Sequence, residues 1–376
     1  MGRGETNAKK RKRQSGAGAA VNGIDGGAAV DTSKPTAIFK PTRGRKWTVS
    51  VALPGSIIAN AQSHEARTSL AGHIARALAV FCVDEIVIFR DGAAKAPRKS
   101  QAHESDPAFE YTGTSDPDQF LIHLLSFLET PPHLRKLLFP IHPNLRTAGT
   151  LPSLDLPHHL RADEWCRFRE GVTLPSAAAA DVTTTTLVDA GLKVPVTLDA
   201  AIPPNTRVTL CFDAEAQRAA SLPQPHEIRG EAVDPAQPRE EEGYYWGYNV
   251  RQANSLSAVF TECAFDGGYD VTIGTSERGV PLDELYTPPM TAVKGTRAAG
   301  LAVGKFSHLL LVFGGVAGLE VALRNDAELQ QLGVVDVKDV FDRWVNVCPG
   351  QGSRTIRTEE AVWIGLMGLR RLVEAN

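Results

Sequence analysis

Small, polar and basic residues gather in one loop near the C-terminus, where residues 346–361 read NVCPGQGSRTIRTEEA. The loop follows an apolar run, precedes a predicted helix, and contains glycines, hydroxyl side chains and two arginines. Glycine lets backbone amides and carbonyls approach a ligand closely, and the planar fork of arginine pairs well with phosphate. This composition predicts a ligand-binding loop rather than a simple turn.

Two further segments repeat the pattern of an apolar strand followed by small residues. They are TIGTSERG at residues 272–279 and VFGGVAGLE at residues 312–320. In open α/β sheets, ligands bind outside the carboxyl ends of the strands. We therefore expect these segments and the C-terminal loop to converge on a pocket lined mostly by main-chain atoms. Such atoms suit the edge of an adenine ring and the hydroxyls of a ribose.

Each segment on its own also fits a simpler interpretation. The run FGG at residues 313–315 is typical of a tight turn. Arg278 is compatible with a surface charge, although a guanidinium among small residues at a strand end favours a phosphate contact. The GQG stretch fails the dinucleotide-binding fingerprint because Thr355 replaces its third glycine, which disfavours a nicotinamide oxidoreductase. The chain contains no GxxxxGK[ST] or GxSxG motif, so a P-loop NTPase and a serine hydrolase are also disfavoured.

The composition of the 376 residues is that of a globular protein, with 43% hydrophobic and 22% charged residues. No apolar run approaches the roughly 20 residues that cross a bilayer, so we expect no membrane span. The N-terminus also lacks the apolar segment of a secretory signal. The cysteines stand far apart without metal-ligand spacing, which predicts reduced thiols and no metal site. They are Cys82, Cys166, Cys211, Cys263 and Cys348.

Positive charge is concentrated at the N-terminus. Residues 1–46 carry 11 Lys and Arg against 3 Asp and Glu, whereas the rest of the chain carries 29 against 40. Residues 1–45 are rich in Gly, Ala, Lys and Arg without periodicity, which predicts a disordered basic tail. The run KKRKR at residues 9–13 suits a nuclear import signal or an arm that attracts phosphate, and a plain solubilising tail stays open. We expect a nuclear location, the nucleolus included, with the cytoplasm as the alternative.

Hydrophobic patterns predict an α/β domain that a β-rich segment interrupts. A strand beginning at Lys46, a one-sided apolar helix at residues 66–81 and an apolar strand at residues 84–89 form a βαβ unit. Residues 168–238 read instead as short strands between Pro, Gly and Asp turns, with no helix of useful length. This spacing suits a small β-barrel or sandwich. Alternating strand and helix patterns return after Glu242 and end in an amphipathic C-terminal helix.

Six blocks of sequence occur in one order along the chain: WTVSVALPGSIIANAQSHEARTSLAGHIARALAVFCVDEIVIF, PHHLR, YYWGYNVR, YDVTIGTSERG, VFGG and NVCPGQGSRTIRTEEA. Together they resemble the SPOUT superfamily of RNA methyltransferases, in the archaeal and eukaryotic branch that includes a centromere-associated human member. The resemblance spans nearly everything from Lys46 to the C-terminus. It is weakest in the β-rich segment and absent from the basic tail.

This resemblance implies an α/β fold with a SPOUT-type trefoil-knotted parallel sheet, an inserted OB-like β-barrel, and assembly as a homodimer. The implied domains are a tail at 1–45, a methyltransferase domain at 46–165 and 243–376, and the barrel at 166–242. The knotted crossing implies S-adenosyl-L-methionine as the cofactor. By position in the matching motifs, the cofactor contacts are Arg278, Gly314, Gly315, Asn346, Gln351, Thr355 and Thr358.

The resemblance also implies methyl transfer to RNA, with a uridine ring nitrogen of ribosomal RNA as the acceptor. The residues themselves do not distinguish a base from a ribose. Arg278 and Glu359 are the candidate catalytic residues, with Glu277 as a further proton acceptor, and Arg354 and Arg357 are the candidate RNA contacts. We expect no metal. A non-catalytic RNA-binding or scaffold protein that keeps the knotted fold stays open as the alternative.

Two pairs of ring side chains allow a second interpretation. The adjacent residues His158 and His159 make no metal site without further ligands, which favours packing at a domain junction over an RNA contact. Trp246 and Tyr248 alternate in a strand predicted at residues 244–251, and such aromatics favour the core over base stacking.

Overall fold

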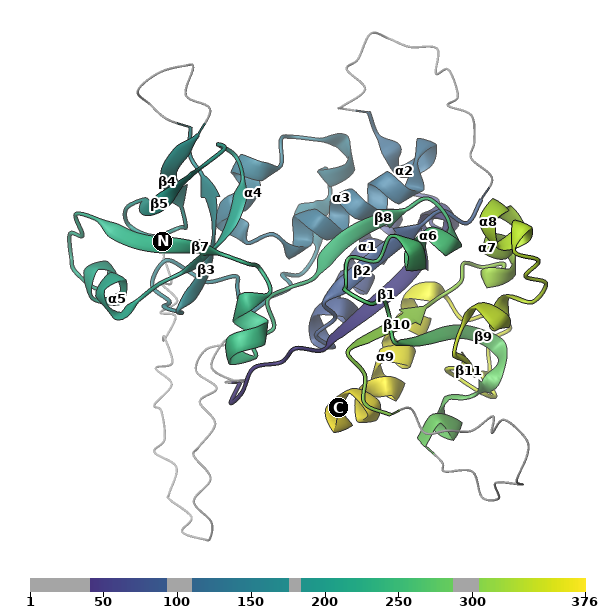
Figure 1. Cartoon of the computed structure of the whole chain (residues 1–376). Helices are drawn as coiled ribbons and strands as arrows, with labels where there is room; N and C mark the ends of the chain where they lie inside the picture. Colours follow the sequence, from purple (N-terminus) through teal and green to yellow (C-terminus); the bar gives the residue numbers. More distant parts are fainter. Residues whose placement is uncertain (1–40, 93–109, 176–183, 287–303) are drawn as a thin grey trace, which may run out of the picture. The chain divides into compact units, whose positions relative to one another are not determined.

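The computed structural model describes residues 41–92, 110–175, 184–286 and 304–376. Its centre is a six-stranded sheet with the order β11-β9-β10-β1-β2-β8, in which all neighbouring strands are parallel (Figure 1). Residues 1–40 of the predicted basic tail, which include the KKRKR run, lie outside the described residues. The strands are β1 (Thr48–Pro54), β2 (Glu85–Phe89), β8 (Asn249–Ala253), β9 (Val271–Pro281), β10 (His308–Val312) and β11 (Arg343–Asn346).

The two strands β1 and β2 are buried along their whole length. They read TVSVALP and EIVIF, and each of their residues is buried. Near-continuous apolar runs of this kind are typical of parallel strands that helices cover on both faces. The predicted βαβ unit is confirmed, because β1 and β2 pair in parallel and α1 (His64–Val80) connects them.

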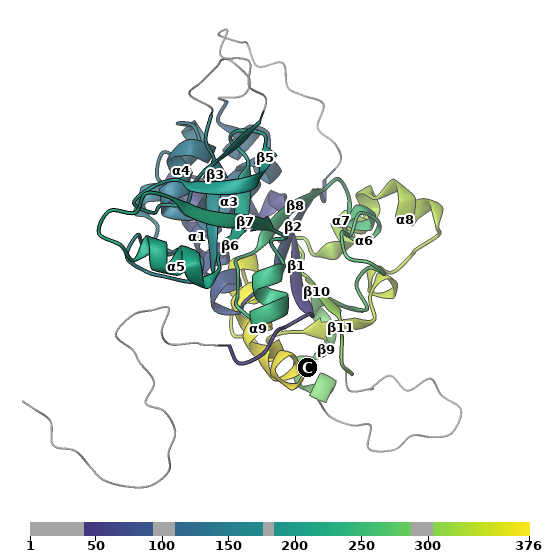
Figure 2. The same ribbon diagram turned by 60° about the vertical axis from the view of Figure 1, so that its left-hand side comes forward.

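Helices cover the two faces of the sheet as separate layers. On one face, α1, α3 (Pro117–Glu129) and α9 (Thr358–Ala375) share an apolar core with the strands. On the other face, α6 (Leu256–Thr261), α7 (Leu319–Asn325) and α8 (Ala327–Gln331) share a second core (Figure 2). The chain therefore leaves β1 toward the first layer and leaves its neighbour β10 toward the second. Such a switch in direction is where open α/β sheets bind ligands.

The C-terminal helix α9 forms as its apolar spacing predicts. Val362, Leu366 and Leu369 are buried, and the backbone N–H of Arg357 donates to the Glu360 carboxylate at 2.9 Å in a capping box. Acidic residues in the first turn also interact favourably with the helix dipole. The start of α9 is thereby defined directly after the predicted binding loop.

The β-rich segment forms a closed barrel with the strand order β3-β4-β5-β7-β6. The barrel has its own apolar core, which includes Val196 and Leu210. The sequence predicts no helix of useful length here, and the structure adds a short helix, α5 (Ala214–Ala220), which connects β6 to β7. This helix begins at Asp213, whose carboxylate accepts the backbone N–H of Ala216 at 2.7 Å. The strands are β3 (Phe168–Thr173), β4 (Thr185–Asp189), β5 (Val196–Ile202), β6 (Arg207–Cys211) and β7 (Ile228–Val233).

The sequence predicts a strand at residues 244–251, but the observed strand β8 begins only at Asn249. The prediction is therefore wrong for residues 244–248. Gly247 adopts a φ of +85°, a left-handed conformation that interrupts a strand. A β-carbon at Gly247 would also collide with the Glu129 carboxylate and the His158 ring. Three aromatic residues of this segment are buried: Tyr245, Trp246 and Tyr248. The core interpretation of the aromatic pair is therefore confirmed.

Candidate active site

The three predicted binding segments lie at the carboxyl ends of three adjacent strands, β11, β9 and β10. Gly274 of β9 pairs with Trp344 of β11, and Val280 pairs with the next residue of β11. Residues 275–279 therefore have no paired residue in β11 and bulge out between two consecutive pairs of the ladder. This bulge is the TSERG part of the first segment, and the strand order places it beside the other two segments.

Side-chain hydrogen bonds join the three segments to one another. The Thr275 hydroxyl donates to the last carbonyl of β10 at 3.0 Å. The Asn346 amide donates to the Glu277 carbonyl at 2.9 Å, which ties the third segment to the bulge. The Thr358 hydroxyl donates to the Gly314 carbonyl at 3.0 Å, which ties it to the second segment. The segments meet at one edge of the sheet, as their shared pattern predicts.

The second segment turns so tightly that it requires glycine. A β-carbon on Gly314 would lie 2.8 Å from the backbone of Gly318 and of Leu319. The backbone N–H of Gly318 donates to the Gly315 carbonyl at 3.0 Å, which closes the turn. The tight-turn interpretation of FGG is therefore also correct. The turn itself carries the main chain of the second segment to the edge where the other segments lie.

The third segment leaves two of its glycines facing open space. Among the described residues, no heavy atom outside the adjoining chain lies within 4 Å of a β-carbon placed on Gly350 or on Gly352. A cavity of about 410 Å³ lies beside this segment, lined by Val347, Pro349 and side chains of α9. This volume falls in the range of small-molecule sites. Open main chain next to such a cavity is suited to hold a small ligand.

The remaining candidate cofactor contacts of the third segment differ in their exposure. Thr358 is buried, and Gln351 is half-buried with its side-chain amide donating to the Ser353 carbonyl at 3.2 Å. Thr355 is exposed. A ligand bound at this segment could therefore contact Thr355 directly. The buried Thr358 instead stabilises the loop through its hydrogen bond to Gly314.

The candidate catalytic and RNA-binding arginines project into solvent. The Arg278 side chain is 75% exposed and lies 3.5 Å from Glu320. Arg354 is exposed, and Arg357 is 76% exposed with its guanidinium 3.9 Å from the largely buried Glu359 carboxylate. Exposed ion pairs of this kind contribute little to stability. The arginines are therefore available to an anionic ligand at little cost to the fold.

Two polar residues that the sequence analysis did not single out also lie at this edge. Ser56 follows β1 and Asp91 follows β2, and the Ser56 hydroxyl donates to Asp91 Oδ2 at 2.7 Å. A β-carbon on Gly315 would lie 3.3 Å from Ser56 Oγ. The local signals that mark these positions are the turn residues PGS and RDG, which directly follow apolar strands. Only the strand order places them beside the glycine turn.

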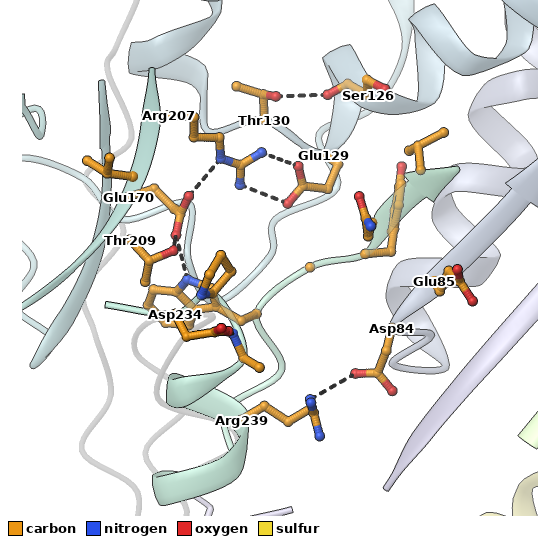
Figure 3. Close-up of a pocket in the computed structure, with 18 of the residues that line it drawn as sticks. Asp84, Glu85, Ser126, Glu129, Thr130, Glu170, Arg207, Thr209, Asp234 and Arg239 are labelled. Atoms are coloured by element: carbon orange, nitrogen blue, oxygen red, sulfur yellow. Dashed lines mark hydrogen bonds and ion pairs between the residues drawn. The ribbon is translucent and has the colours of Figure 1, made fainter. Parts of the chain in front are cut away.

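A larger cavity, of about 780 Å³, lies between the barrel and α3 (Figure 3). Arg207 of β6 donates to the Glu129 carboxylate of α3 at 2.6 and 3.1 Å and to Glu170 of β3 at 2.7 Å. Glu170 also accepts the Thr209 hydroxyl at 2.6 Å and the Trp246 indole N–H at 2.7 Å. This network, the junction network, bonds the barrel to the helix layer of the sheet.

The electrostatics of the junction network match a structural role. Burial alone would raise the pKa of Glu129, but the Arg207 charge and the hydrogen bond from His158 outweigh it and hold the pKa well below its usual range. His158 Nε2 lies 2.9 Å from Glu129 Oε1. Burial, together with the neighbouring His158 ring, lowers the pKa of His159 to about 3. The two histidines therefore have a packing role where the barrel meets the helix layer of the sheet, and both rings bond to the Glu129 carbonyl.

The junction cavity does not suit a polyanion. Its carboxylates outnumber its guanidinium groups, and phosphate binding needs the opposite balance. Arg239, one of its two arginines, already donates to the carbonyls of Arg45 and Lys46 at 2.9 and 2.8 Å. The charged residues that line the cavity are Asp84, Glu85, Glu129, Glu170, Arg207, Asp234 and Arg239.

Within the described ranges, no group of three or more His, Cys, Asp or Glu side chains is placed to hold a metal ion. Across the same residues, no helix combines the length and the apolar character needed to span a membrane.

Comparison with protein families assigns the chain to a known class of protein. The family described as "Putative RNA methyltransferase" matches residues 48–369, which include the parallel sheet, the barrel and all three segments. The chain belongs to this family. The resemblance to RNA methyltransferases is therefore confirmed, and the strand edge is the candidate active site of an RNA methyltransferase.

Individual relatives of this RNA methyltransferase come from animals and archaea. A Homo sapiens protein named 28S rRNA (uridine-N(3))-methyltransferase is 43% identical over 334 residues, which cover 88% of this chain and 80% of the human one. A Drosophila melanogaster protein of the same name is 41% identical over 329 residues, covering 87% of this chain and 62% of its own. An uncharacterized Halobacterium salinarum protein is 28% identical over 334 residues, covering 87% of this chain and 100% of its own.

Proposed function

We propose that this protein uses S-adenosyl-L-methionine to methylate N3 of a uridine in large-subunit ribosomal RNA. Its similarity to the human and fruit-fly 28S rRNA (uridine-N(3))-methyltransferases, over 88% and 87% of the chain, supports this substrate. The observation that carries the proposal is the meeting of three strand-end segments through Thr275, Asn346 and Thr358. Main-chain groups of three separate segments then surround one spot at the sheet edge.

The residues at this edge fit an adenosyl group. Gly350 and Gly352 leave their main chain open, and the adjoining cavity of about 410 Å³ has room for a nucleoside. When bound, S-adenosyl-L-methionine supplies a methyl group activated by the positive charge on its sulfur. We assign its contacts to residues of the three segments: Arg278, Gly314, Gly315, Asn346, Gln351, Thr355 and Thr358.

The chain contributes orientation to the reaction. Holding two reacting groups in line can remove roughly 7–11 kcal/mol of the barrier at the favourable limit. The hydrogen bonds of Asn346 and Thr358 hold the segments together without a ligand, which reduces the ordering cost of binding. Arg354 and Arg357 are assigned to RNA phosphates, because phosphate contacts position a nucleic acid without reading its sequence.

Two residues are assigned to the chemical step itself. Arg278 carries a charge that can stabilise the anion developing on the acceptor base, and its high exposure lets an RNA base approach it. Glu359 is a candidate proton acceptor. Its place in the first turn of α9, 3.9 Å from Arg357, also fits a role in starting the helix.

The finer architecture is inferred from the family resemblance. We infer a SPOUT-type sheet in which residues 346–360 form the crossing of a trefoil knot, and the bond of Thr358 to Gly314 supports their return to the second segment. The five-stranded closed barrel supports an OB-like assignment. We further infer domains at 46–165, 166–242 and 243–376, a homodimer, and a nuclear or nucleolar location.

Cells that lack the protein test the proposed function. N3-methyluridine in large-subunit rRNA, mapped by mass spectrometry of nuclease fragments, should disappear from at least one position. Wild-type protein should restore it, and Arg278→Ala should restore much less. A non-catalytic scaffold predicts unchanged methylation in the deletion and full cellular rescue by Arg278→Ala. Retention of every N3-methyluridine in the deletion strain would refute the proposal.

A further inference from the structure

We propose that Asp91, held in place by Ser56, is the catalytic base that accepts the N3 proton of the target uridine, in place of the candidate Glu359, which faces Arg357 at 3.9 Å. The inference rests on the proposed function, because it assigns a proton acceptor to that same reaction. N3 of uridine carries a hydrogen that must leave as the methyl group arrives. A positioned carboxylate is one of the side chains that perform this general-base role.

Asp91 lies where the sheet topology predicts a ligand. β1 is adjacent to β10, with Ala52 opposite Val312, and β1 is also adjacent to β2, with Pro54 opposite Phe89. The residues that follow these three parallel strands therefore share one edge. Because the chain leaves β1 and β10 toward opposite helix layers, this edge is the switch point at which α/β sheets bind ligands.

Gly315 places the pair beside the candidate cofactor site. A β-carbon on Gly315 would lie 3.3 Å from Ser56 Oγ and 3.4 Å from Asp91 Oδ2. At these distances the polar pair borders the second binding segment directly, and a β-carbon on Gly315 would be in tight contact with Ser56. A base that enters at this edge to meet the methyl donor would pass within reach of the Asp91 carboxylate.

The Asp91 carboxylate is held firmly but keeps unused acceptor capacity. Oδ2 accepts the Ser56 hydroxyl at 2.7 Å, and the main-chain carbonyl of Asp91 accepts the side-chain amide of Asn325 at 2.9 Å. Among the described residues, no hydrogen bond reaches Oδ1. The Asp91 residue is 9% exposed, so its carboxylate is largely enclosed but not sealed from solvent. Oδ1 is therefore available to a substrate N–H.

Within the part of the chain that the structure describes, no ion pair neutralises Asp91. Arg90 is directed to Asp118 at 3.1 Å and lies 4.0 Å from Asp116. Burial raises the pKa of Asp118 although the Arg90 hydrogen bond acts against it, and the charges of Asp116 and Asp91 add to the rise. The α7 residue that contacts Asp91 is the uncharged Asn325. The guanidinium of the adjacent Arg90 is thus directed to other carboxylates, and among the described residues Asp91 has Ser56 as its side-chain partner.

The proposed step balances without a further reactant. The N3–H bond breaks and its proton passes to Asp91 Oδ1. The electron pair left on N3 forms the new bond to the methyl carbon, while the sulfur–methyl bond breaks and leaves its electrons on sulfur. The proton then passes from Asp91 to water. Ser56 keeps its hydroxyl hydrogen throughout and acts as a positioning residue.

The test compares Asp91→Asn with Asp339→Asn, which removes an exposed carboxylate elsewhere on the chain. The substrates are large-subunit rRNA transcripts made with uridine or with 5-fluorouridine, whose N3 proton is more acidic. Single-turnover methylation is measured on both transcripts and across alkaline pH. Binding of S-adenosylhomocysteine by calorimetry and thermal unfolding are measured on the same proteins.

Asp91→Asn should slow methylation of the uridine transcript by about 10²- to 10⁴-fold, the usual contribution of a general base. Affinity for S-adenosylhomocysteine should stay within about two-fold of wild type. The ratio of the wild-type rate to the Asp91→Asn rate should be about ten-fold or more smaller on the 5-fluorouridine transcript and at alkaline pH, because N3 then ionises more easily. A wild-type rate in Asp91→Asn, or an equal loss on both transcripts, overturns the assignment.

Ser56→Ala provides a second variant if Asp91→Asn does not fold. It should slow methylation of the uridine transcript by about ten-fold and methylation of the 5-fluorouridine transcript by less. An equal loss of rate on both transcripts overturns the assignment here too. The failure of the proposed function would look different. Wild-type protein would then leave N3 unmethylated on the uridine transcript, whatever the behaviour of the variants.

Discussion

The junction network and the carboxyl edge of the parallel sheet use polar residues in opposite ways. At the junction, Glu129, Glu170 and Arg207 bond to one another around the larger cavity (Figure 3). At the sheet edge, Arg278 points into solvent and Asp91 keeps an oxygen without a described partner. A fully bonded buried network makes a structure rigid, whereas unused polar groups beside open main chain suit a ligand. Cavity size alone would have selected the junction instead of the sheet edge.

Removing one partner of the junction network should have the largest effect. Glu129→Gln removes the carboxylate partner of His158 and one of the two carboxylates that bind Arg207, and breaking a buried ion pair costs about 3 kcal/mol or more. Urea unfolding should show this loss of stability. The control Glu241→Gln breaks an exposed pair with Arg167 and should cost less than about 1 kcal/mol. Equal losses in the two variants would mean that the junction is not a structural anchor.

The junction should also make stability fall in mild acid. The pKa of His159 is about 3 in the folded protein, below its ordinary value of 6.5. Below pH 6.5 the unfolded chain therefore binds a proton at His159 that the folded protein does not bind. Between pH 6.5 and pH 3, stability should fall by roughly 1.4 kcal/mol for each pH unit. His159→Gln should flatten this slope, whereas the exposed His226→Gln should not. Parallel slopes in both variants and wild type would exclude His159 as the source.

A change at the sheet edge should act on binding more than on stability. In Gly314→Ala, the new β-carbon lies 2.8 Å from the Gly318 backbone and forces the turn to shift. Affinity for S-adenosylhomocysteine, measured by equilibrium dialysis, should fall about ten-fold, which corresponds to about 1.4 kcal/mol. The control Gly149→Ala places its methyl group in open space and should bind normally. An unchanged affinity of Gly314→Ala would remove the second segment from the site.

The smallest effect is expected from the bond that joins the second and third segments. Thr358→Val removes the hydroxyl that donates to the Gly314 carbonyl, and a single hydrogen bond of this kind contributes about 1 kcal/mol. Denaturant unfolding should detect the difference. Thr150→Val removes an exposed bond within one turn and should cost less. A larger cost at Thr150 would contradict the idea that Thr358 connects two parts of the site.

The sequence predicted the parts of the site whose signals are local. An apolar strand followed by glycine, hydroxyl and basic residues can be recognised within about ten positions, and the three segments were predicted in this way. The individual residues Gly314, Asn346 and Thr358 were assigned from the family resemblance. The meeting of the segments at one edge also followed from a general property of parallel sheets. The start of α9 was predictable for the same reason, because its capping residues are neighbours in the chain.

Features that depend on distant residues were not predictable from one sequence. Ser56 and Asp91 became visible only through the strand order, in which Thr48 of β1 lies opposite His308 of β10. The late start of β8 follows from Gly247, whose conformation depends on packing against Glu129. The junction network likewise joins elements that no local pattern connects. Topology and packing, rather than local propensity, decide these contacts.

Calorimetric titration of S-adenosylhomocysteine into the wild-type protein and into Gly352→Leu tests the central claim most directly. The β-carbon of residue 352 meets open space, so the fold should tolerate leucine, but the side chain would occupy the space assigned to the methyl donor. We predict binding to about one site per wild-type chain, at least about ten-fold weaker binding to Gly352→Leu, and no change in the control Gly149→Leu. No binding to the wild-type protein, or equal binding to all three proteins, would contradict the account.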